Sequence, residues 1–331
     1  MSLLEVKNLV VEFPNRHGVL RALDQISFSI APGEILGVVG ESGAGKSLTG
    51  ASIIGLLEPP GHVASGEILL EGERIDNLPP EKMRHIRGRR IGAIFQDPLT
   101  SLNPLYTVRR QLIETIQTHL KLSDKEARQR AIDLLKDTGI PAAEERVDHY
   151  PHQFSGGMRQ RVVIALALAA EPKLIVADEP TTALDVSIQA QIISLLKNIC
   201  RTRGAAVMLI THDMGVIAET CDRVAVMYAG RIAEIGPVHE VINHPAHPYT
   251  RGLMASIPDM DDDRERLNQI DGAMPRLNAI PKGCAFNPRC TQVFGRCQEE
   301  RPDLMPAGAT RAACWLHAAD YQPETVTEDA V

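Results

Sequence analysis

The sequence predicts an α/β protein built on a mostly parallel β-sheet, with an N-terminal antiparallel subdomain, an inserted helical subdomain and a small cysteine-rich C-terminal extension. Three observations support this fold class. Four short apolar runs are spaced along the chain, an alternating segment stands near its start, and a long helical stretch separates the second run from the third. The length of 331 residues allows about two domains.

The first predicted element is an antiparallel sheet. Residues 3–13 alternate apolar and polar side chains, and two further short runs, 66–70 and 74–75, flank the turn Glu71-Gly72. Such alternation is typical of strands with one buried and one solvated face, and a glycine turn between two runs is typical of a hairpin. We therefore expect antiparallel strands before the helical part of the chain.

The four apolar runs predict a different kind of strand. They are short, rich in β-branched residues and bounded by glycine, proline or charge, which is the pattern of strands buried on both faces. Crossover helices cover both sides of such strands, so no alternation is needed. The runs are 34–40, 91–95, 174–177 and 205–210.

Helices are expected between and after these strands. Residues 108–171 form the helical insert, in which Ser123 and Glu126 make a capping box for a helix at 125–138. A further helix at 186–203 stops at Gly204, and a hairpin follows at 224–235. We expect domains at 1–240, with the helical subdomain at 101–170, and at 241–331.

Composition excludes several functional classes. The 44% hydrophobic content excludes a disordered chain, and the net charge of −7 gives no basic field that would collect nucleic acid. The longest uncharged apolar run, 162–170, is far shorter than the ~20 residues that span a bilayer. We therefore expect a cytosolic chain that reaches a membrane only through a partner and whose six cysteines form no disulfides.

A phosphate-binding loop is predicted between the run at 34–40 and a helix at 46–57. The segment matches the pattern G-x-x-x-x-G-K-S/T, in which glycines let backbone N–H groups surround a phosphate. The lysine would reach the β- and γ-phosphates, and the serine hydroxyl would take a Mg²⁺ position. The residues are Gly40, Glu41, Ser42, Gly43, Ala44, Gly45, Lys46 and Ser47.

Two acids follow the apolar run 174–177, at the strand end where ligands bind in open α/β sheets. We predict that Asp178 serves Mg²⁺ through water and that Glu179 orients or deprotonates the attacking water. A strand end capped by two solvated acids is the alternative, and the nearby phosphate loop disfavours it.

A third element, Ser155-Gly156-Gly157, precedes an apolar helix. Ser155 can cap that helix, which leaves the N–H groups of Gly156 and Gly157 free to face an anion. Taken alone, the segment would be an ordinary helix start.

In this order, the three elements resemble the phosphate loop, acidic strand end and signature loop of ABC-transporter ATPases. The resemblance covers residues 3 to about 236, with Met158 standing where the family usually has glutamine. It implies further roles for four residues: Gln96 as a Mg²⁺ and catalytic glutamine, Asp185 as the D-loop aspartate, His212 as the switch histidine and Phe13 as the adenine-stacking aromatic. A buried strand phenylalanine is an equal alternative for Phe13.

The resemblance also implies partners. Two such ATPases face each other head to tail, and each ATP with its Mg²⁺ lies between the phosphate loop of one and the signature loop of the other. A second, homologous ATPase subunit, two transmembrane permease subunits and, indirectly, a periplasmic binding protein are therefore expected, and nucleic acid is not. The chain would be a peripheral protein on the cytoplasmic face of a bacterial inner membrane.

Two segments indicate which branch of the ABC-transporter ATPases the chain resembles. Residues 243–250 and the segment around Gln96 resemble the ATPase subunits of dipeptide and oligopeptide importers, in particular the first ATPase subunit of the dipeptide-permease type. Import of di- or oligopeptides is the function this implies. Glutathione, haem or a nickel chelate remains an alternative cargo, and a cytosolic nucleic-acid-associated ATPase is a more distant one. We expect His244 and His247 to be solvated histidines in a surface turn.

The C-terminal cysteines are Cys284, Cys290, Cys297 and Cys314. Structural zinc usually shows a close Cys-x2-4-Cys pair, which is absent here, whereas four thiolates around iron and sulfide tolerate irregular spacing. The resemblance favours a 4Fe-4S cluster, with zinc and unpaired structural thiols as alternatives. Cys200 and Cys221 are expected to be buried packing residues.

Overall fold

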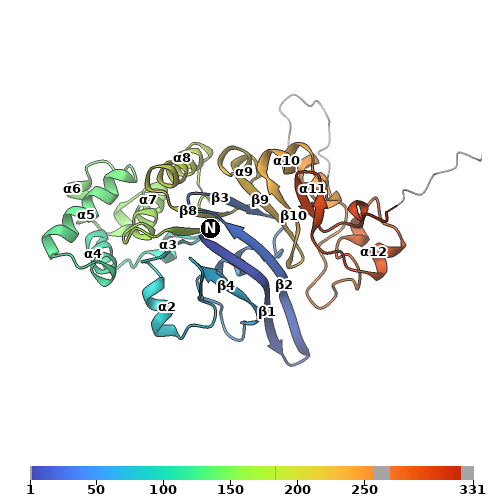
Figure 1. Ribbon diagram of the computed structural model, residues 1–331. Coiled ribbons are helices and arrows are strands. Elements are labelled where there is room, and N and C mark those ends of the chain that lie inside the picture. Colours follow the sequence, from blue (N-terminus) through green and yellow to red (C-terminus); the bar gives the residue numbers. More distant parts are fainter. Residues whose placement is uncertain (1, 183, 257–268, 322–331) are drawn as a thin grey trace, which may run out of the picture.

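The computed structural model describes residues 2–182, 184–256 and 269–321. The fold is built on two β-sheets (Figure 1). The smaller sheet is antiparallel, in the order β2-β1-β4-β5, and the larger has the order β11-β12-β10-β9-β3-β8-β7-β6. The strands are β1 (Leu4–Asn15), β2 (Gly18–Ile30), β3 (Ile35–Val39), β4 (His62–Leu70), β5 (Glu73–Arg74), β6 (Ile91–Ile94), β7 (Leu174–Asp178), β8 (Ala206–Ile210), β9 (Arg223–Tyr228), β10 (Arg231–Pro237), β11 (Met305–Ala307) and β12 (Thr310–Ala312).

Helices cover the larger sheet and form a separate group at one end of the molecule, where α4, α5 and α6 lie (Figure 1). No helix in the described ranges is long and apolar enough to cross a membrane. The α-helices are α1 (Lys46–Ile53), α2 (Pro80–Ile86), α3 (Pro98–Ser101), α4 (Val108–His119), α5 (Asp124–Asp137), α6 (Ala143–Arg146), α7 (Gly156–Ala167), α8 (Val186–Arg203), α9 (Met214–Thr220), α10 (Val238–Asn243), α11 (Pro248–Ala255) and α12 (Gly295–Glu299).

The five central strands β9, β3, β8, β7 and β6 run parallel. Four of them, β3, β6, β7 and β8, are the strands that the apolar runs predict, and they are buried on both faces. The fifth, β9, was predicted only as part of the hairpin with β10, which the structure also contains. In β3, Ile35 and Val39 join the core beneath the helices, whereas Leu36 and Val38 join the core shared with the antiparallel sheet. Because successive side chains point to opposite faces, every position of the strand must be apolar.

The antiparallel sheet is confirmed, but two local expectations differ from the structure. Strand β2 was not predicted, because polar residues such as Asp24 and Gln25 and shifts in its register with β1 break the alternation. Helix α1 ends at Ile53 rather than reaching residue 57. Gly55 adopts a left-handed φ of 65° directly after it, a conformation that ends helices.

The helical insert follows its local signals. Ser123 and Glu126 form the predicted capping box at the start of α5. Ser155 caps α7 by accepting the N–H of Met158, and Gly204 ends α8 in a left-handed conformation. Side-chain caps and glycine stops act within a few residues, which is why the sequence alone locates them.

The C-terminal extension continues the larger sheet. Strand β12 of the extension pairs with β10, so one sheet contains strands from both sides of the predicted domain boundary at residue 240. The fully buried carboxylate of Glu234 on β10 accepts the N–H groups of Ala246 and His247, both at 2.9 Å, and the Thr310 hydroxyl at 3.1 Å. Three donors satisfy this buried acid, and they tie two separate segments of the extension, around Ala246 and around Thr310, to one strand.

His247 is not the solvated histidine that the sequence suggested; His244 is exposed, but His247 is 3% exposed. Its Nδ1 accepts the N–H of Tyr249 at 3.0 Å and thereby caps α11. Burial lowers the pKa of His247 to about 4, although the Ala313 carbonyl favours the protonated ring. The local proline-rich sequence could not predict this burial, because the groups that cover His247 lie on or beside the distant strands β10 and β12.

The buried histidine makes the stability of the protein depend on pH. Its pKa of about 4 in the folded state lies below the unfolded value near 6.5, so stability is complete above pH 6.5 and falls between pH 6.5 and 4. We expect His247 to account for about 2 kcal/mol of the loss in unfolding free energy between pH 7 and pH 5. Urea denaturation at both pH values measures it. His247→Asn, which keeps a capping acceptor, should lose less on acidification, and an equal loss in both proteins would refute the assignment.

Candidate active site

The phosphate loop turns sharply after β3 and leads into α1. Gly40 has a φ of 148°, and a Cβ there would lie 2.2 Å from the Met227 carbonyl oxygen of β9. Gly45, with a φ of 102°, is the N-cap of α1 and makes no side-chain cap. The first N–H groups of the helix are therefore not engaged by a cap, and with the helix dipole they suit a phosphate.

Lys46 lies folded across the loop. Its Nζ donates to the carbonyls of Gly40 at 2.8 Å and Glu41 at 3.1 Å. Burial lowers the pKa of Lys46, while the carboxylates of Glu179 and Asp178 counteract this effect. The ammonium is thus held at the mouth of the loop, where the predicted phosphates would lie.

Ser47 and Asp178 come together as the sequence predicts. The Ser47 hydroxyl donates to Oδ1 of Asp178 at 3.1 Å, although 131 positions separate the two residues. Burial raises the pKa of Asp178, and the Ser47 hydrogen bond opposes that rise. A hydroxyl and a carboxylate are ligands that Mg²⁺ prefers, so the pair fits the expected metal.

Glu179 is held by three side chains from three segments. Gln96 Nε2 and Thr182 Oγ1 donate to Oε2 at 3.2 and 2.9 Å, and His212 Nδ1 lies 3.4 Å from Oε1. The φ of Glu179 is 45°, an unfavourable conformation for this residue type. Gln96, Glu179 and His212 thus meet as expected. Thr182 was not foreseen, because no pattern marks a hydroxyl three residues after an acid.

Phe13 lies beside α1 and is partly exposed. It lines a cavity of about 320 Å³ together with Ser47, Phe95 and Asp178. A Cβ on Gly61 would lie 2.5 Å from its ring, so that turn supports it from behind. The aromatic ring is therefore near the phosphate loop without being sealed in the core.

The signature residues do not join this group within one chain. Ser155, Gly156 and Gly157 begin α7 and lie against α8, where a Cβ on Gly157 would be 2.8 Å from Ile188 Cγ2. Asp185 is exposed at the start of α8, and Val186 beside it is 81% exposed. Among the described residues, no hydrogen bond joins these positions to the phosphate loop or to Glu179.

The C-terminal cysteines do not form the predicted metal site. Among the described residues, no three His, Cys, Asp or Glu side chains converge closely enough to hold a metal ion. Burial raises the pKa of Cys284 to about 11 and that of Cys314 to about 12, and the neighbouring thiols raise both further. The cysteines lie near one another, since the thiols of Cys290 and Cys297 contribute to the raised pKa of both Cys284 and Cys314. Cys200 and Cys221 are buried, as expected.

Comparisons with known proteins agree with this geometry. The family model described as ABC transporter matches residues 23–182, and the model described as oligopeptide/dipeptide transporter, C-terminal region, matches residues 233–297. The dipeptide transport ATP-binding protein of Escherichia coli is 45% identical over 95% of this chain and 96% of its own.

Two further matches cover the chain to different extents. The oligopeptide transport ATP-binding protein of Bacillus subtilis is 47% identical over 99% of this chain and 92% of its own. A bacterial ABC transporter cassette, solved as a dimer in a post-hydrolysis state with ADP and Pi, has a TM-score of 0.64 and 30% identity. That match covers 71% of this chain and 98% of the cassette, so the cassette alone accounts for most of the fold.

Glu179→Gln tests whether the Glu179 carboxylate accepts a proton during hydrolysis. The amide can still accept hydrogen bonds from Gln96 and Thr182, but it cannot take a proton from water. We expect nucleotide binding to change by less than about threefold and ATP hydrolysis to fall at least about 100-fold. Nucleotide titration of the chain and phosphate release from the assembled complex measure the two. The control is Glu144→Gln, at an acid that is 58% exposed on α6. Hydrolysis at the wild-type rate would contradict the role.

Proposed function

Because the chain belongs to the family of ATP-binding subunits of peptide ABC importers, we propose that it hydrolyses ATP to drive uptake of di- or oligopeptides through separate membrane subunits. The observation that carries this proposal is the match over nearly the full chain, extension included, to dipeptide and oligopeptide transport proteins. The net charge of −7 lends no support to a nucleic-acid-associated ATPase.

The site geometry supports a division of labour in hydrolysis. Lys46 and the loop N–H groups would bind the β- and γ-phosphates. Ser47 with Asp178 would hold Mg²⁺, which would supply positive charge to the phosphates. Glu179 accepts a proton from the attacking water. His212 and Gln96, which both contact Glu179, keep its carboxylate directed at that water. Phe13 supports the adenine.

Dimerisation completes the site in this proposal. The exposed Ser155 and Gly156 and the half-buried Gly157, at the start of α7, would face the γ-phosphate bound by a partner. Asp185 with Val186 would lie along the contact. A large exposed apolar residue such as Val186 is better placed in an interface than in water. The similar cassette is a dimer in its solved structure. We propose that the partner here is a second, homologous ATPase subunit.

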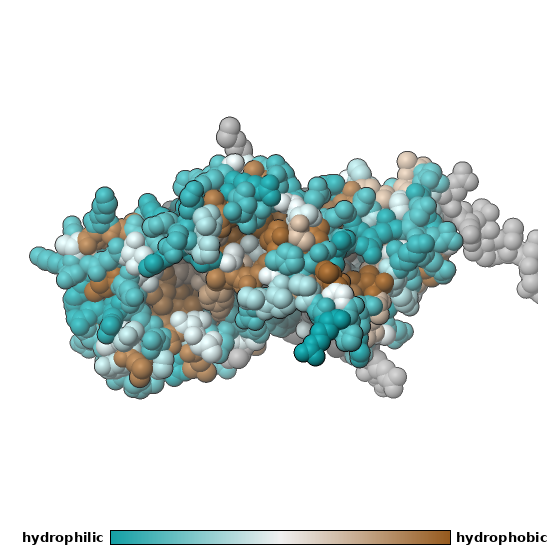
Figure 2. Space-filling view, turned by 90° about the horizontal axis from the view of Figure 1, so that it is seen from below, coloured by the Kyte–Doolittle hydropathy of each residue, from teal (hydrophilic) through white to brown (hydrophobic). Residues whose placement is uncertain are grey.

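The membrane subunits would dock near Gln96. The underside of the molecule shows several apolar patches along its middle among hydrophilic side chains (Figure 2). Three large apolar side chains near Gln96 are exposed: Phe95 before α3 is 46% exposed, Leu99 within α3 is 63% exposed, and Leu105 after it is 79% exposed. Short apolar segments of two permease subunits fit this chemistry and would hold the chain at the cytoplasmic face of an inner membrane, where a periplasmic binding protein delivers cargo from the other side.

We propose separately that the four C-terminal cysteines bind a 4Fe-4S cluster, although in this structure their side chains are not close enough together to hold a metal. It rests on the chemistry of the donors: four cysteines lie in one region, and backbone N–H groups donate to three of their sulfurs, as N–H groups do around thiolate-bound clusters. Binding would require the thiols to lose their protons and draw closer together.

Anaerobic purification decides the cluster. We expect a brown protein with visible absorption from thiolate–iron bands, about four irons per chain, and loss of colour in Cys297→Ser. Cys200→Ser, at a buried cysteine outside the region, is the control. A colourless protein with one zinc, or with no metal, would refute the cluster.

Transport by the assembled complex tests the proposed function. Reconstituted with its membrane and ATPase partners in vesicles, the protein should drive ATP-dependent uptake of a labelled dipeptide, and Lys46→Ala should abolish it. Unlabelled di- and oligopeptides should compete. Competition by glutathione, haem or a nickel chelate, with none by peptides, would overturn the substrate class while leaving the ATPase role intact.

A further inference from the structure

The phosphate loop contains an acid at its first variable position. The Glu41 side chain is 27% exposed, and its carboxylate acts electrostatically on Lys46. An unpaired negative charge beside an anion-binding loop would repel a nucleotide. The chain must therefore neutralise Glu41 if the loop is to bind a triphosphate well.

Arg289, in the C-terminal extension, supplies the opposite charge. Its Nη1 donates to both carboxylate oxygens of Glu41 at 3.0 Å, although 248 positions separate the residues. The arginine side chain is 6% exposed, and its Nε and Nη2 donate to the carbonyls of Asp271 and Ile270 at 2.9 and 3.3 Å. All three nitrogens are occupied, so the guanidinium is fixed in one orientation.

Two more residues of the extension touch the same loop. The Tyr249 hydroxyl accepts the N–H of Glu41 at 2.9 Å, and the Tyr249 ring is fully buried. Its ring centroid lies 4.6 Å from that of Tyr228 and 5.4 Å from that of Phe286. The Met274 methyl lies 3.1 Å from where a Cβ on Gly43 would stand. We call Tyr249, Met274 and Arg289 the loop clamp.

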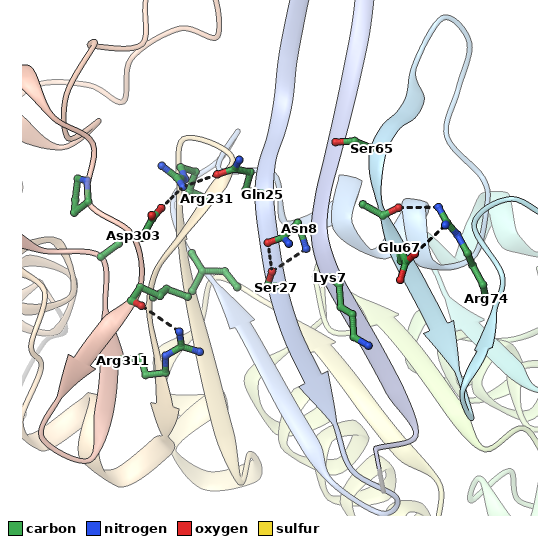
Figure 3. Close-up of a pocket in the computed structure, with 15 residues that line it drawn as sticks. Lys7, Asn8, Gln25, Ser27, Ser65, Glu67, Arg74, Arg231, Asp303 and Arg311 are labelled. Carbon is green, nitrogen blue, oxygen red and sulfur yellow. Dashed lines mark hydrogen bonds and ion pairs between the residues drawn. The ribbon is translucent and has the colours of Figure 1, made fainter.

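The loop clamp is anchored at a distance from the loop. Besides the β10–β12 pairing, Arg301 of the extension forms an ion pair with Asp24 of β2. Arg231 of β10 donates to Asp303 at 3.2 Å and to Gln25 at 3.4 Å, and thereby joins the extension to the antiparallel sheet (Figure 3). These contacts hold the extension against both sheets, so the clamp is not a loose appendage.

We propose that Arg289 and Tyr249 are positioning residues of the nucleotide site, and that Arg289 sets nucleotide affinity by neutralising Glu41. Tyr249 fixes the start of the loop through the Glu41 N–H, which leaves the later N–H groups to face the phosphates. The proposal rests on the proposed ATPase function and adds to it: the extension determines how tightly the site holds ATP.

The two partners of the ion pair provide a matched test. Arg289→Gln and Glu41→Gln both break it, so a purely structural role predicts the same loss from each. Neutralisation predicts opposite results: Arg289→Gln should weaken ATP binding about tenfold, whereas Glu41→Gln should bind ATP more tightly than wild type. Titration of the full-length chain with a fluorescent ATP analogue measures each affinity, and circular dichroism checks folding.

The double variant Glu41→Gln/Arg289→Gln completes the cycle. With both charges removed, affinity should return to within about threefold of wild type. In the assembled complex, Arg289→Gln should raise the KM for ATP and leave kcat within about twofold. Should Arg289→Gln fail to fold, Glu41→Gln decides the question: ATP binding tighter than wild type supports neutralisation, and binding equal to or weaker than wild type overturns it.

Tyr249→Phe should weaken ATP binding about threefold, because one hydrogen bond to the loop is lost. Three results would overturn the proposal. They are equal losses of ATP affinity in Glu41→Gln and Arg289→Gln, a double variant that binds ATP as weakly as Arg289→Gln, and a Tyr249→Phe chain with unchanged affinity. The outcomes separate the two proposals. A wild-type chain that binds no ATP would overturn the proposed function and the clamp with it, whereas tight wild-type binding with indifferent variants would overturn the clamp alone.

Discussion

The close approach of Gly40 to the backbone of β9 is the constraint on which the site depends. A side chain at this position would collide with the Met227 carbonyl, so only glycine lets the chain leave β3 and turn into α1 there. The turn sets the loop at the carboxyl ends of the parallel strands, beside the end of β7. Asp178 and Glu179 then lie within reach because their strand is two places along in the same sheet.

Around that turn, the site is assembled from segments that share no sequence neighbourhood. Gln96, Thr182 and His212 follow β6, β7 and β8, and all three reach Glu179. Parallel strands place their ends at one edge, so the sheet itself brings the groups together. The left-handed backbone of Glu179 is maintained by its surroundings, including the bond from its N–H to the Ile210 carbonyl.

Features with local causes could be predicted from the sequence, and features with distant causes could not. The Ser123 and Ser155 caps and the doubly buried strands depend on neighbouring residues or on the strand's own pattern. By contrast, the burial of His247 depends on Glu234 and β12, and the pairing of Arg289 with Glu41 joins residues 248 positions apart. Strand β2 was missed because polar residues such as Asp24 and Gln25 break its alternation, and their partners Arg301 and Arg231 lie far away in the sequence.

The pairing of β12 with β10 has a consequence for how this protein could change in evolution or in the laboratory. An appended module can usually be exchanged between relatives as a unit, but this one shares a sheet, a buried acid and a phosphate-loop contact with the rest of the chain. A chimaera that takes its extension from a relative would have to carry compatible residues at 41 and 234 as well. The extension and the nucleotide loop are therefore expected to be inherited together.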